Sequence, residues 1–275
     1  MTVRENTRLG AFAWLTLTSC ACSPVLALAD DATRYHLFRP VPADQMRELS
    51  TDRPDQTESP YTVDAGHFQA EVDLVNLSRD LEGDGRAEHL GLAATNLKVG
   101  LTNRVDLQLV TPLFERERLT GPLDFEQSGV GDLTLRLKVN AWGDDGGPTA
   151  FGVMPFVTIP TSESRDSAWG SSLLFAVELP RGFGLGSMLE YDATGEESEW
   201  LGTVTVGHDL VGPLGAYLEL AGTRIDRGDG VARRTFNSGL TWAVSRDVQL
   251  DGGVLVGMND AADDVAGFLG FAIRR

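Results

Sequence analysis

The chain has 275 residues, 42% of them hydrophobic, and a formal net charge of −17. Beyond residue 29, no apolar stretch approaches the roughly 20 residues that a transmembrane helix needs, which excludes helical spanning by the mature chain. The acidity argues against nucleic acid or an anionic membrane surface as a partner.

The first 29 residues have the pattern of a secretory signal peptide. A polar start with Arg4 and Arg8 is followed by the uncharged, mostly apolar run Leu9–Leu28. The small residues of Ala27-Leu28-Ala29 then precede two aspartates, as at a signal-peptidase site. We expect export and cleavage after Ala29, with an uncleaved membrane anchor as the alternative.

Both cysteines, Cys20 and Cys22, lie inside this leader. Leu17-Thr18-Ser19-Cys20 also resembles a lipoprotein acylation box, so a lipidated Cys20 is a second possible processing product. Cleavage after Ala29 removes two basic residues and one acid, which moves the net charge from −17 to −18. The mature chain then has no cysteine and depends on its hydrogen-bond ladder and its core instead of disulfides.

Residues 30–66 differ from the rest of the chain in being rich in proline and polar residues. Arg39-Pro40-Val41-Pro42 and the run Ser50–Pro60 oppose both helix and strand interiors. Two interpretations follow for this N-terminal segment. It is either a periplasmic tail, or a plug folded into a barrel lumen with Arg53 paired to interior carboxylates.

Residues 67–275 predict an all-β domain of about 12 antiparallel strands. The clearest is Asp132–Val139, where aliphatic and polar residues alternate without a break and therefore occupy opposite faces. The predicted strands are His67–Leu77, Leu90–Leu101, Arg104–Thr111, Gly131–Asn140, Thr149–Ile159, Ser171–Leu179, Gly182–Asp192, Glu199–His208, Leu214–Thr223, Arg234–Val244, Asp247–Gly257 and Asp264–Arg274.

The connectors between these strands alternate between short and long. Thr102-Asn103 and Ser245-Arg246 are compact turns, whereas Ser78–His89 and Pro112–Val130 are long and polar. Outer-membrane barrels have short periplasmic turns and longer external loops, so the pattern predicts a transmembrane β-barrel. A soluble sandwich has no reason to sort its connectors in this way.

The solvent decides which strand face points outward. Lipid-facing side chains must be apolar, and Arg or Lys at mid-bilayer costs about 2–4 kcal/mol, so we expect the charged faces to line the lumen. Mutual pairing of these charges is favoured over contact with a ligand, because narrow barrels fill themselves. The predicted lumen-lining residues are Glu71, Asp73, Lys98, Asp106, Arg136, Lys138, Glu178, Glu190 and Glu219, together with Asp251.

Large apolar side chains also fall on the inward faces. A lining that mixes them with charges suits a small amphipathic or aromatic solute better than a bulk water pore. These residues are Met154, Phe156, Leu174, Met188, Tyr217, Leu255 and Phe268.

Two sequence blocks stand out. Gly66–Glu71 extends the first block, and the second is Gly129–Leu133. The residues of the first block are Thr51, Asp52, Arg53, Pro54, Asp55 and Glu58, with Thr57, Ser59 and Pro60. Together the blocks resemble the outer-membrane family named for the meta-pathway of phenol degradation, which is labelled a transporter. The resemblance covers essentially the mature chain. It implies an outer-membrane barrel of a Gram-negative cell that passes small solutes, aromatic compounds among them.

This interpretation also implies the surroundings of the protein. Its partners are outer-membrane lipid including lipopolysaccharide, the small solute and the barrel-assembly machinery, with no cofactor and no metal. The chain ends Phe271-Ala272-Ile273-Arg274-Arg275, so the terminal aromatic residue that the machinery commonly reads is displaced inward.

Two other functions remain open at this point. An outer-membrane lipid hydrolase needs a histidine near a serine and an orienting group. The candidate histidines are His36, His67, His89 and His208, and none shows the phospholipase spacing. A soluble periplasmic β-protein is the third hypothesis. The loop that begins at Asp80 resembles a calcium loop but has Gly91 where the closing glutamate is required, so a solvated hairpin is favoured.

Overall fold

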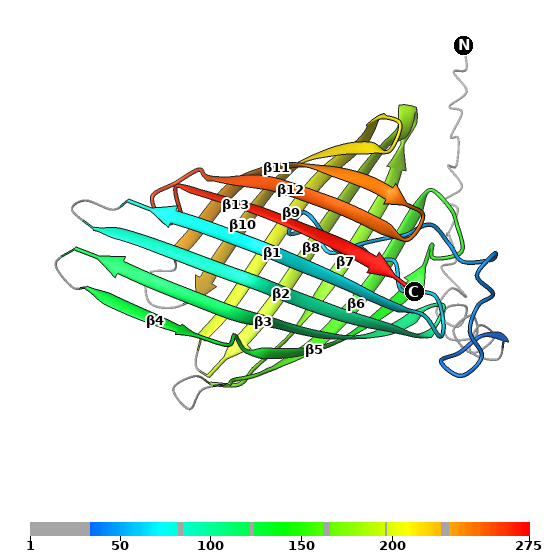
Figure 1. Ribbon diagram of the computed structural model, residues 1–275, viewed down its shortest axis with the longest axis horizontal. Coiled ribbons are helices and arrows are strands. Elements are labelled where there is room, and N and C mark those ends of the chain that lie inside the picture. The colour runs from blue at the N-terminus through cyan, green and yellow to red at the C-terminus, as the bar shows by residue number, and fades with distance from the viewer. Residues whose placement is uncertain (1–33, 82–84, 122–123, 162–165, 196, 227–230) are drawn as a thin grey trace, which may run out of the picture.

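The computed structural model describes residues 34–81, 85–121, 124–161, 166–195, 197–226 and 231–275, and these residues contain thirteen strands (Figure 1). A single 3₁₀ turn, η1 (Pro180–Gly182), joins β7 to β8. The strands are β1 (Phe68–Asp80), β2 (Arg86–Thr102), β3 (Val105–Thr120), β4 (Phe125–Gly129), β5 (Leu133–Trp142), β6 (Thr149–Ile159), β7 (Ala168–Leu179), β8 (Phe183–Thr194), β9 (Glu197–Val211), β10 (Leu214–Asp226), β11 (Val231–Ser245), β12 (Val248–Gly257) and β13 (Val265–Arg274).

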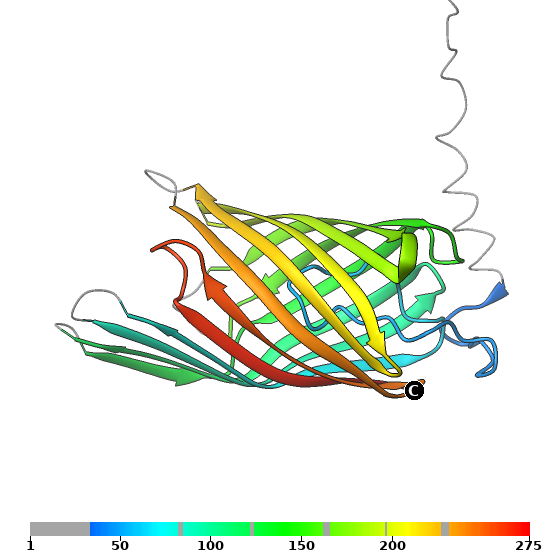
Figure 2. The same cartoon turned by 90° about the horizontal axis from the view of Figure 1, so that it is seen from above.

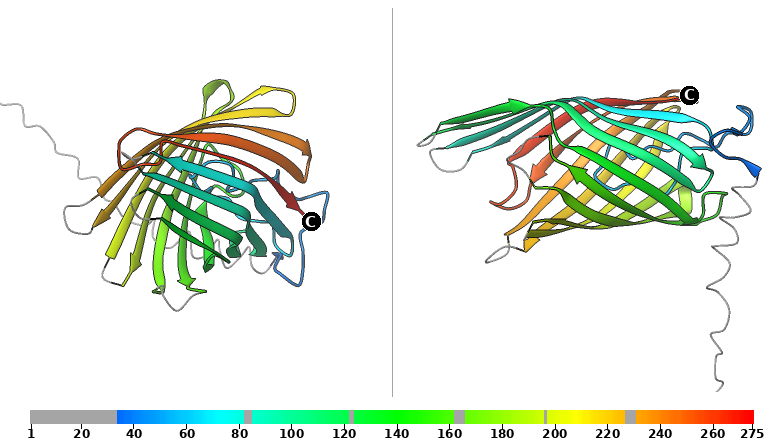
Figure 3. Two further views of the ribbon diagram at one scale, coloured as in Figure 1. Left: turned by 60° about the vertical axis from the view of Figure 1, so that its left-hand side comes forward. Right: turned by 90° about the horizontal axis from the view of Figure 1, so that it is seen from below.

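The strands form one closed antiparallel barrel (Figure 3). β1 pairs with both β2 and β13, and β2 also pairs with β3, which closes the ring. β3 pairs with β5 near its start and with β4 near its end, so β4 and β5 share one place among twelve. The predicted fold class is therefore confirmed. No described helix is long and apolar enough to cross a membrane.

The strand boundaries differ from the expected ones at one end of the barrel. Pro112–Val130 was expected to be a loop, but β3 continues to Thr120 and β4 pairs against it; Ser78–His89 is likewise mostly strand. Charged residues occupy both faces of Glu115–Arg118, so hydrophobic alternation gives no signal there. These strand ends pair through their backbones, and β1–β4 project beyond the rest of the rim (Figure 2).

The two faces of the wall are chemically distinct. Leu97, Leu137 and Leu218 are 37–56% exposed on the outer face. Their chain neighbours Lys98, Lys138 and Glu219 are buried on the inner face. This is the orientation that a hydrocarbon surrounding requires, because a closed barrel satisfies its backbone internally and presents apolar side chains to lipid.

Aromatic side chains lie near both ends of the outer face. Trp142 stacks on Phe151 with ring centroids 4.9 Å apart at the end that holds the C-terminus. Tyr191 packs between Trp169, at 5.9 Å, and Trp200, at 4.8 Å, at the opposite end. Two aromatic girdles flanking an apolar band are typical of barrels in a bilayer.

Candidate functional site

The N-terminal segment enters the barrel from the end that holds the C-terminus (Figure 2). The Leu37 N–H donates to the Leu101 carbonyl at 2.9 Å, and Ala65 forms a parallel bridge with Gly100. A side chain at position 100 would collide with the Asp64 carbonyl, so this glycine permits the close approach. Residues 51–65 contact the inner face of the barrel wall, and we call them the luminal segment.

Carboxylates of the barrel wall hold the luminal segment by its backbone. Glu219 on β10 accepts hydrogen bonds from the N–H groups of Gln56 at 3.1 Å and Thr57 at 2.8 Å. Asp106 on β3 accepts one from the Val63 N–H at 3.0 Å. A coil inside a barrel has no neighbouring strand to pair with, and unpaired buried N–H groups are costly, so these acids replace a β-ladder.

Asp52 is the centre of a buried ion cluster. Lys98 on β2 and Lys138 on β5 both pair with its carboxylate, and Lys98 also pairs with Glu71. Glu71 in turn accepts the Asp52 N–H at 3.1 Å. Burial alone would raise the pKa of Asp52, but the ammonium groups of Lys138 and Lys98 hold that pKa well below its usual range.

Arg53 connects the luminal segment to the neighbouring part of the wall, formed by β1 and β12. Its guanidinium pairs with Asp73 on β1 at 2.6 Å and with Asp251 on β12 at 2.6 Å, and it lies 5.6 Å from the centroid of the Phe268 ring. A side chain at Gly270 would collide with this guanidinium. Arg53 therefore lies between two interior carboxylates.

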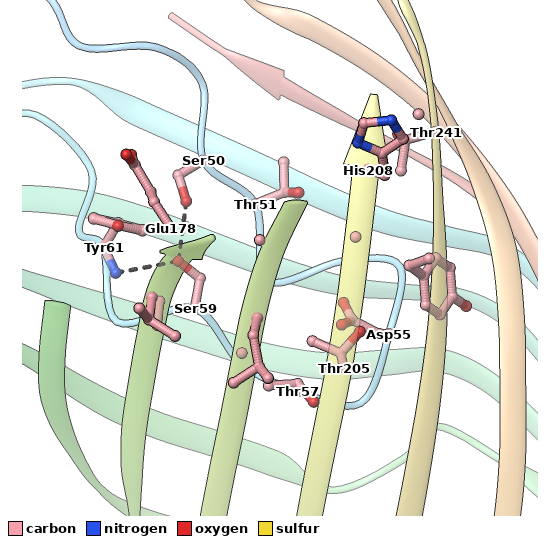
Figure 4. A pocket seen from close by; sticks show the side chains of 18 of the residues that line it. Ser50, Thr51, Asp55, Thr57, Ser59, Tyr61, Glu178, Thr205, His208 and Thr241 are labelled. Carbon is pink, nitrogen blue, oxygen red and sulfur yellow. Dashed lines mark hydrogen bonds between the residues drawn. The ribbon is translucent and has the colours of Figure 1, made fainter. Parts of the chain in front are cut away.

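The remaining pair, Glu58 with Arg136 on β5, is less completely satisfied. Arg136 Nη1 lies 2.5 Å from Glu58 Oε1, while Glu58 Oε2 has no hydrogen-bond partner among the described residues. Asp55 is the only acid of the luminal segment to which no ion pair within the described structure is assigned, and it lies beside Thr205 (Figure 4). Burial, followed by the nearby Glu219, raises the pKa of Asp55 to about 7.

The luminal segment separates two cavities. The larger, of 560 Å³, lies toward the end with the C-terminus and includes Thr51, Tyr61 and Glu178 in its lining (Figure 4). The smaller, of 280 Å³, lies on the other side of the segment, against β1–β3. Pro54, Asp55 and Glu58 line both, so these residues form the partition between the cavities.

The larger cavity is acidic. Its described lining has no lysine or arginine. Aromatic surface from Tyr61 and Tyr217 completes the wall. The carboxylates are those of Glu48, Asp55, Glu58, Glu178 and Asp209.

The predicted lumen residues fall into two groups. Most of them contact the luminal segment directly. Their charged groups bind the backbone N–H groups and the charged side chains of this segment more often than they pair with each other across the lumen. These are Glu71, Asp73, Lys98, Asp106, Arg136, Lys138, Glu219 and Asp251. Glu190 instead accepts a hydrogen bond from Ser172 at 2.6 Å, and Glu178 is exposed at the larger cavity.

Sequence reasoning missed a further ion cluster, at the end of the barrel where the N-terminal segment enters. Asp64 pairs with Arg47 at 2.7 Å and with Arg274 on β13 at 3.4 Å, and Arg47 also pairs with Asp144 in the β5–β6 turn. Strand alternation would have placed Arg274 on the inner face, because Phe268, Gly270 and Ala272 precede it at steps of two. Nothing local in the sequence indicates Arg47 or Asp144.

The sequence of the chain matches a known protein family. The family described as "Putative MetA-pathway of phenol degradation" matches residues 51–274. The chain belongs to this family. The match of this phenol-degradation family begins at Thr51, so it includes the luminal segment together with the barrel. No curated protein sequence matches the chain.

Three solved structures share the fold of this family member. An outer membrane channel from Pseudomonas putida F1 is 15% identical, with a TM-score of 0.63 over 82% of this chain and 100% of that one. The NanC porin is 8% identical, with a TM-score of 0.50 over 74% and 98%. The translocator domain of the autotransporter NalP from Neisseria meningitidis is 9% identical, with a TM-score of 0.51 over 93% and 97%. The chain has the fold of outer-membrane barrels.

The arrangement offers little support for a hydrolase. Within the described structure no histidine is hydrogen-bonded to a serine hydroxyl: His208 Nδ1 lies 2.9 Å from the Gly182 carbonyl, and His67 Nε2 lies 2.8 Å from that of Val41. No group of metal-ligating side chains is found among the described residues. The calcium-like stretch after Asp80 falls partly on residues 82–84, outside the described residues, as does the leader of residues 1–29.

Proposed function

We propose that this protein is an outer-membrane channel through which small solutes diffuse passively along a path between the luminal segment and the barrel wall. The observation that carries the proposal is the pair of cavities separated by Pro54, Asp55 and Glu58. The membrane-facing apolar surface and the family membership support the location. Export by a signal peptide and insertion by the barrel-assembly machinery are expected with it.

The lining suggests which solutes are favoured. Carboxylates without lysine or arginine in the larger cavity attract cations and repel anions. Tyr61 and Tyr217 offer aromatic contact to the same solute. We therefore expect small cationic or neutral amphipathic compounds, aromatic ones included, to pass more readily than carboxylates or phosphates.

Reversal potentials across a KCl gradient in planar bilayers test this function. We expect a preference for K⁺ over Cl⁻ that increases between about pH 6 and pH 8, because Asp55 is neutral below its pKa of about 7 and anionic above it. Asp55→Asn should remove this pH step. Asp226→Asn, at an exposed acid paired with Arg224 on β10, should keep it. Absence of conductance, or a preference for Cl⁻, would contradict the proposal.

A further inference from the structure

Four arginines gather on the outer face of the part of β1–β4 that projects beyond the rim. Strand register assigns the face: Leu77 is opposite Leu90, and Leu90 is opposite Arg116. One row further along, Arg79 is opposite Glu88, and Glu88 is opposite Arg118. Arg86 is two residues before Glu88 and shares its face. These side chains therefore continue the membrane-facing surface upward from its apolar band.

The local charge of this surface is positive, whereas the net charge of the chain is negative. The four arginines are accompanied on the same face by two carboxylates, Glu88 and Glu126, in a chain whose net charge is −17. Arg79 lies 3.7 Å from Glu88 and Arg118 lies 3.9 Å from Glu126. The guanidinium of Arg116, whose backbone pairs with β2 and β4, has no ion pair or hydrogen bond within the described part of the chain. This face therefore has an excess of two positive charges and attracts anions, although the chain as a whole is acidic.

A groove of 310 Å³ lies directly below these arginines. Its upper wall includes Arg79 and Arg116 together with Glu88, and its lower part includes Leu77, Leu90, Val254 and Val265. Val254 and Val265 are 48% and 46% exposed on the outer face. The groove thus presents guanidinium groups at one end and aliphatic surface at the other.

The groove lies at the extracellular end of the barrel. Both the N-terminal segment and the C-terminus lie at the opposite end (Figure 1), which in outer-membrane barrels faces the periplasm. A molecule in contact with both the arginines and the aliphatic surface must have phosphate or carboxylate groups at the level of the head groups and hydrocarbon below. Guanidinium groups bind phosphate oxygens in bidentate geometry.

We propose that this groove is a binding site for a phosphorylated glycolipid of the outer leaflet, the lipid A part of lipopolysaccharide. A phosphate group binds Arg79 and Arg116, and an acyl chain lies along Leu77, Leu90, Val254 and Val265. The proposal uses the membrane orientation of the barrel but not its channel activity, so the two can fail separately.

The test compares lipid binding by the detergent-solubilised full chain using native mass spectrometry. We expect lipid A to bind Arg79→Gln/Arg116→Gln about tenfold more weakly than the unaltered protein. Arg224→Gln is the matched control, because Arg224 is also an outward, exposed arginine near the same end of the barrel but lies outside the groove. It should bind like the unaltered protein. The single variant Arg116→Gln serves if the double variant does not fold.

The lipid panel decides the chemistry. Lipid A without its phosphates should bind the unaltered protein as weakly as intact lipid A binds the double variant. Phosphatidylglycerol should bind more weakly than lipid A, with little response to the arginine changes. Equal binding of lipid A by the unaltered protein and the double variant, or equal binding of phosphorylated and dephosphorylated lipid A, would overturn the proposal. Tighter binding of phosphatidylglycerol than of lipid A would also do so.

Discussion

Asp52 is the residue on which the most luminal contacts converge. Its carboxylate pairs with Lys98 and Lys138 and accepts the Ser59 N–H at 3.0 Å, so it joins two strands to two points of the luminal segment. Both lysines are buried; Lys98 shares its charge between Asp52 and Glu71, and Lys138 pairs with Asp52. The block that begins at Thr51 therefore has a structural role, because its aspartate neutralises buried lysines of the barrel wall.

Asp52→Asn should strongly destabilise the protein. The amide has nearly the same shape but leaves the buried ammonium group of Lys138 without an ion-pair partner among the described residues, whereas Lys98 keeps Glu71. We expect a loss of about 3–5 kcal/mol in the free energy of unfolding. The midpoint of urea unfolding in micelles or vesicles measures it. Asp226→Asn, which removes an exposed partner of Arg224, should change the free energy by at most about 1 kcal/mol. Equal effects of the two variants would show that the Asp52 cluster is not stabilising.

The strand elements show where sequence reasoning is effective and where it ends. Within the bilayer each strand must present apolar residues outward at every second position, so runs such as Asp132–Val139 could be predicted with their faces. Beyond the bilayer that requirement disappears. The charged end of β3 and the short β4 are set by backbone pairing with distant strands, and hydrophobic alternation could not indicate them.

The candidate site was predictable to a similar degree. Alternation identified the inward charges of the wall, including Lys98, Lys138 and Glu219. It could not choose between a periplasmic tail and a plug for residues 30–66, because a coil has no period. The contacts of Arg53 with Asp251 and of Thr57 with Glu219 join positions far apart in the chain, and such pairs leave no local signal.

A substitution in β13 tests how tightly the luminal segment fits against the barrel wall. Gly270→Ala should place a methyl group against the Arg53 guanidinium and the Val72 carbonyl, shifting Arg53 from its two carboxylates at a cost of about 1–3 kcal/mol. The midpoint of urea unfolding in micelles or vesicles should then fall. Gly202→Ala on β9, where an added Cβ meets no atom within 4 Å, is the matched control. Equal unfolding midpoints of the two variants would contradict the close fit.

At the scale of the whole molecule, charge is sorted by surface. The lumen and its larger cavity are rich in carboxylates, some of which hold the luminal segment, whereas an excess of arginine lies outside on the extended β1–β4 region. The barrel wall, the luminal segment and the two cavities between them form one unit. In the proposed function a solute passes beside the segment, which stays in place.

A cross-link between the luminal segment and the wall tests this central claim most directly. Thr57 Oγ1 lies 2.7 Å from Thr203 Oγ1 on β9, so Thr57→Cys/Thr203→Cys should form a disulfide on oxidation of the mature chain. We predict that the cross-linked protein conducts in planar bilayers as well as the reduced form does. Failure to cross-link in the folded barrel, or conductance that appears after reduction alone, would contradict a fixed segment with a path beside it.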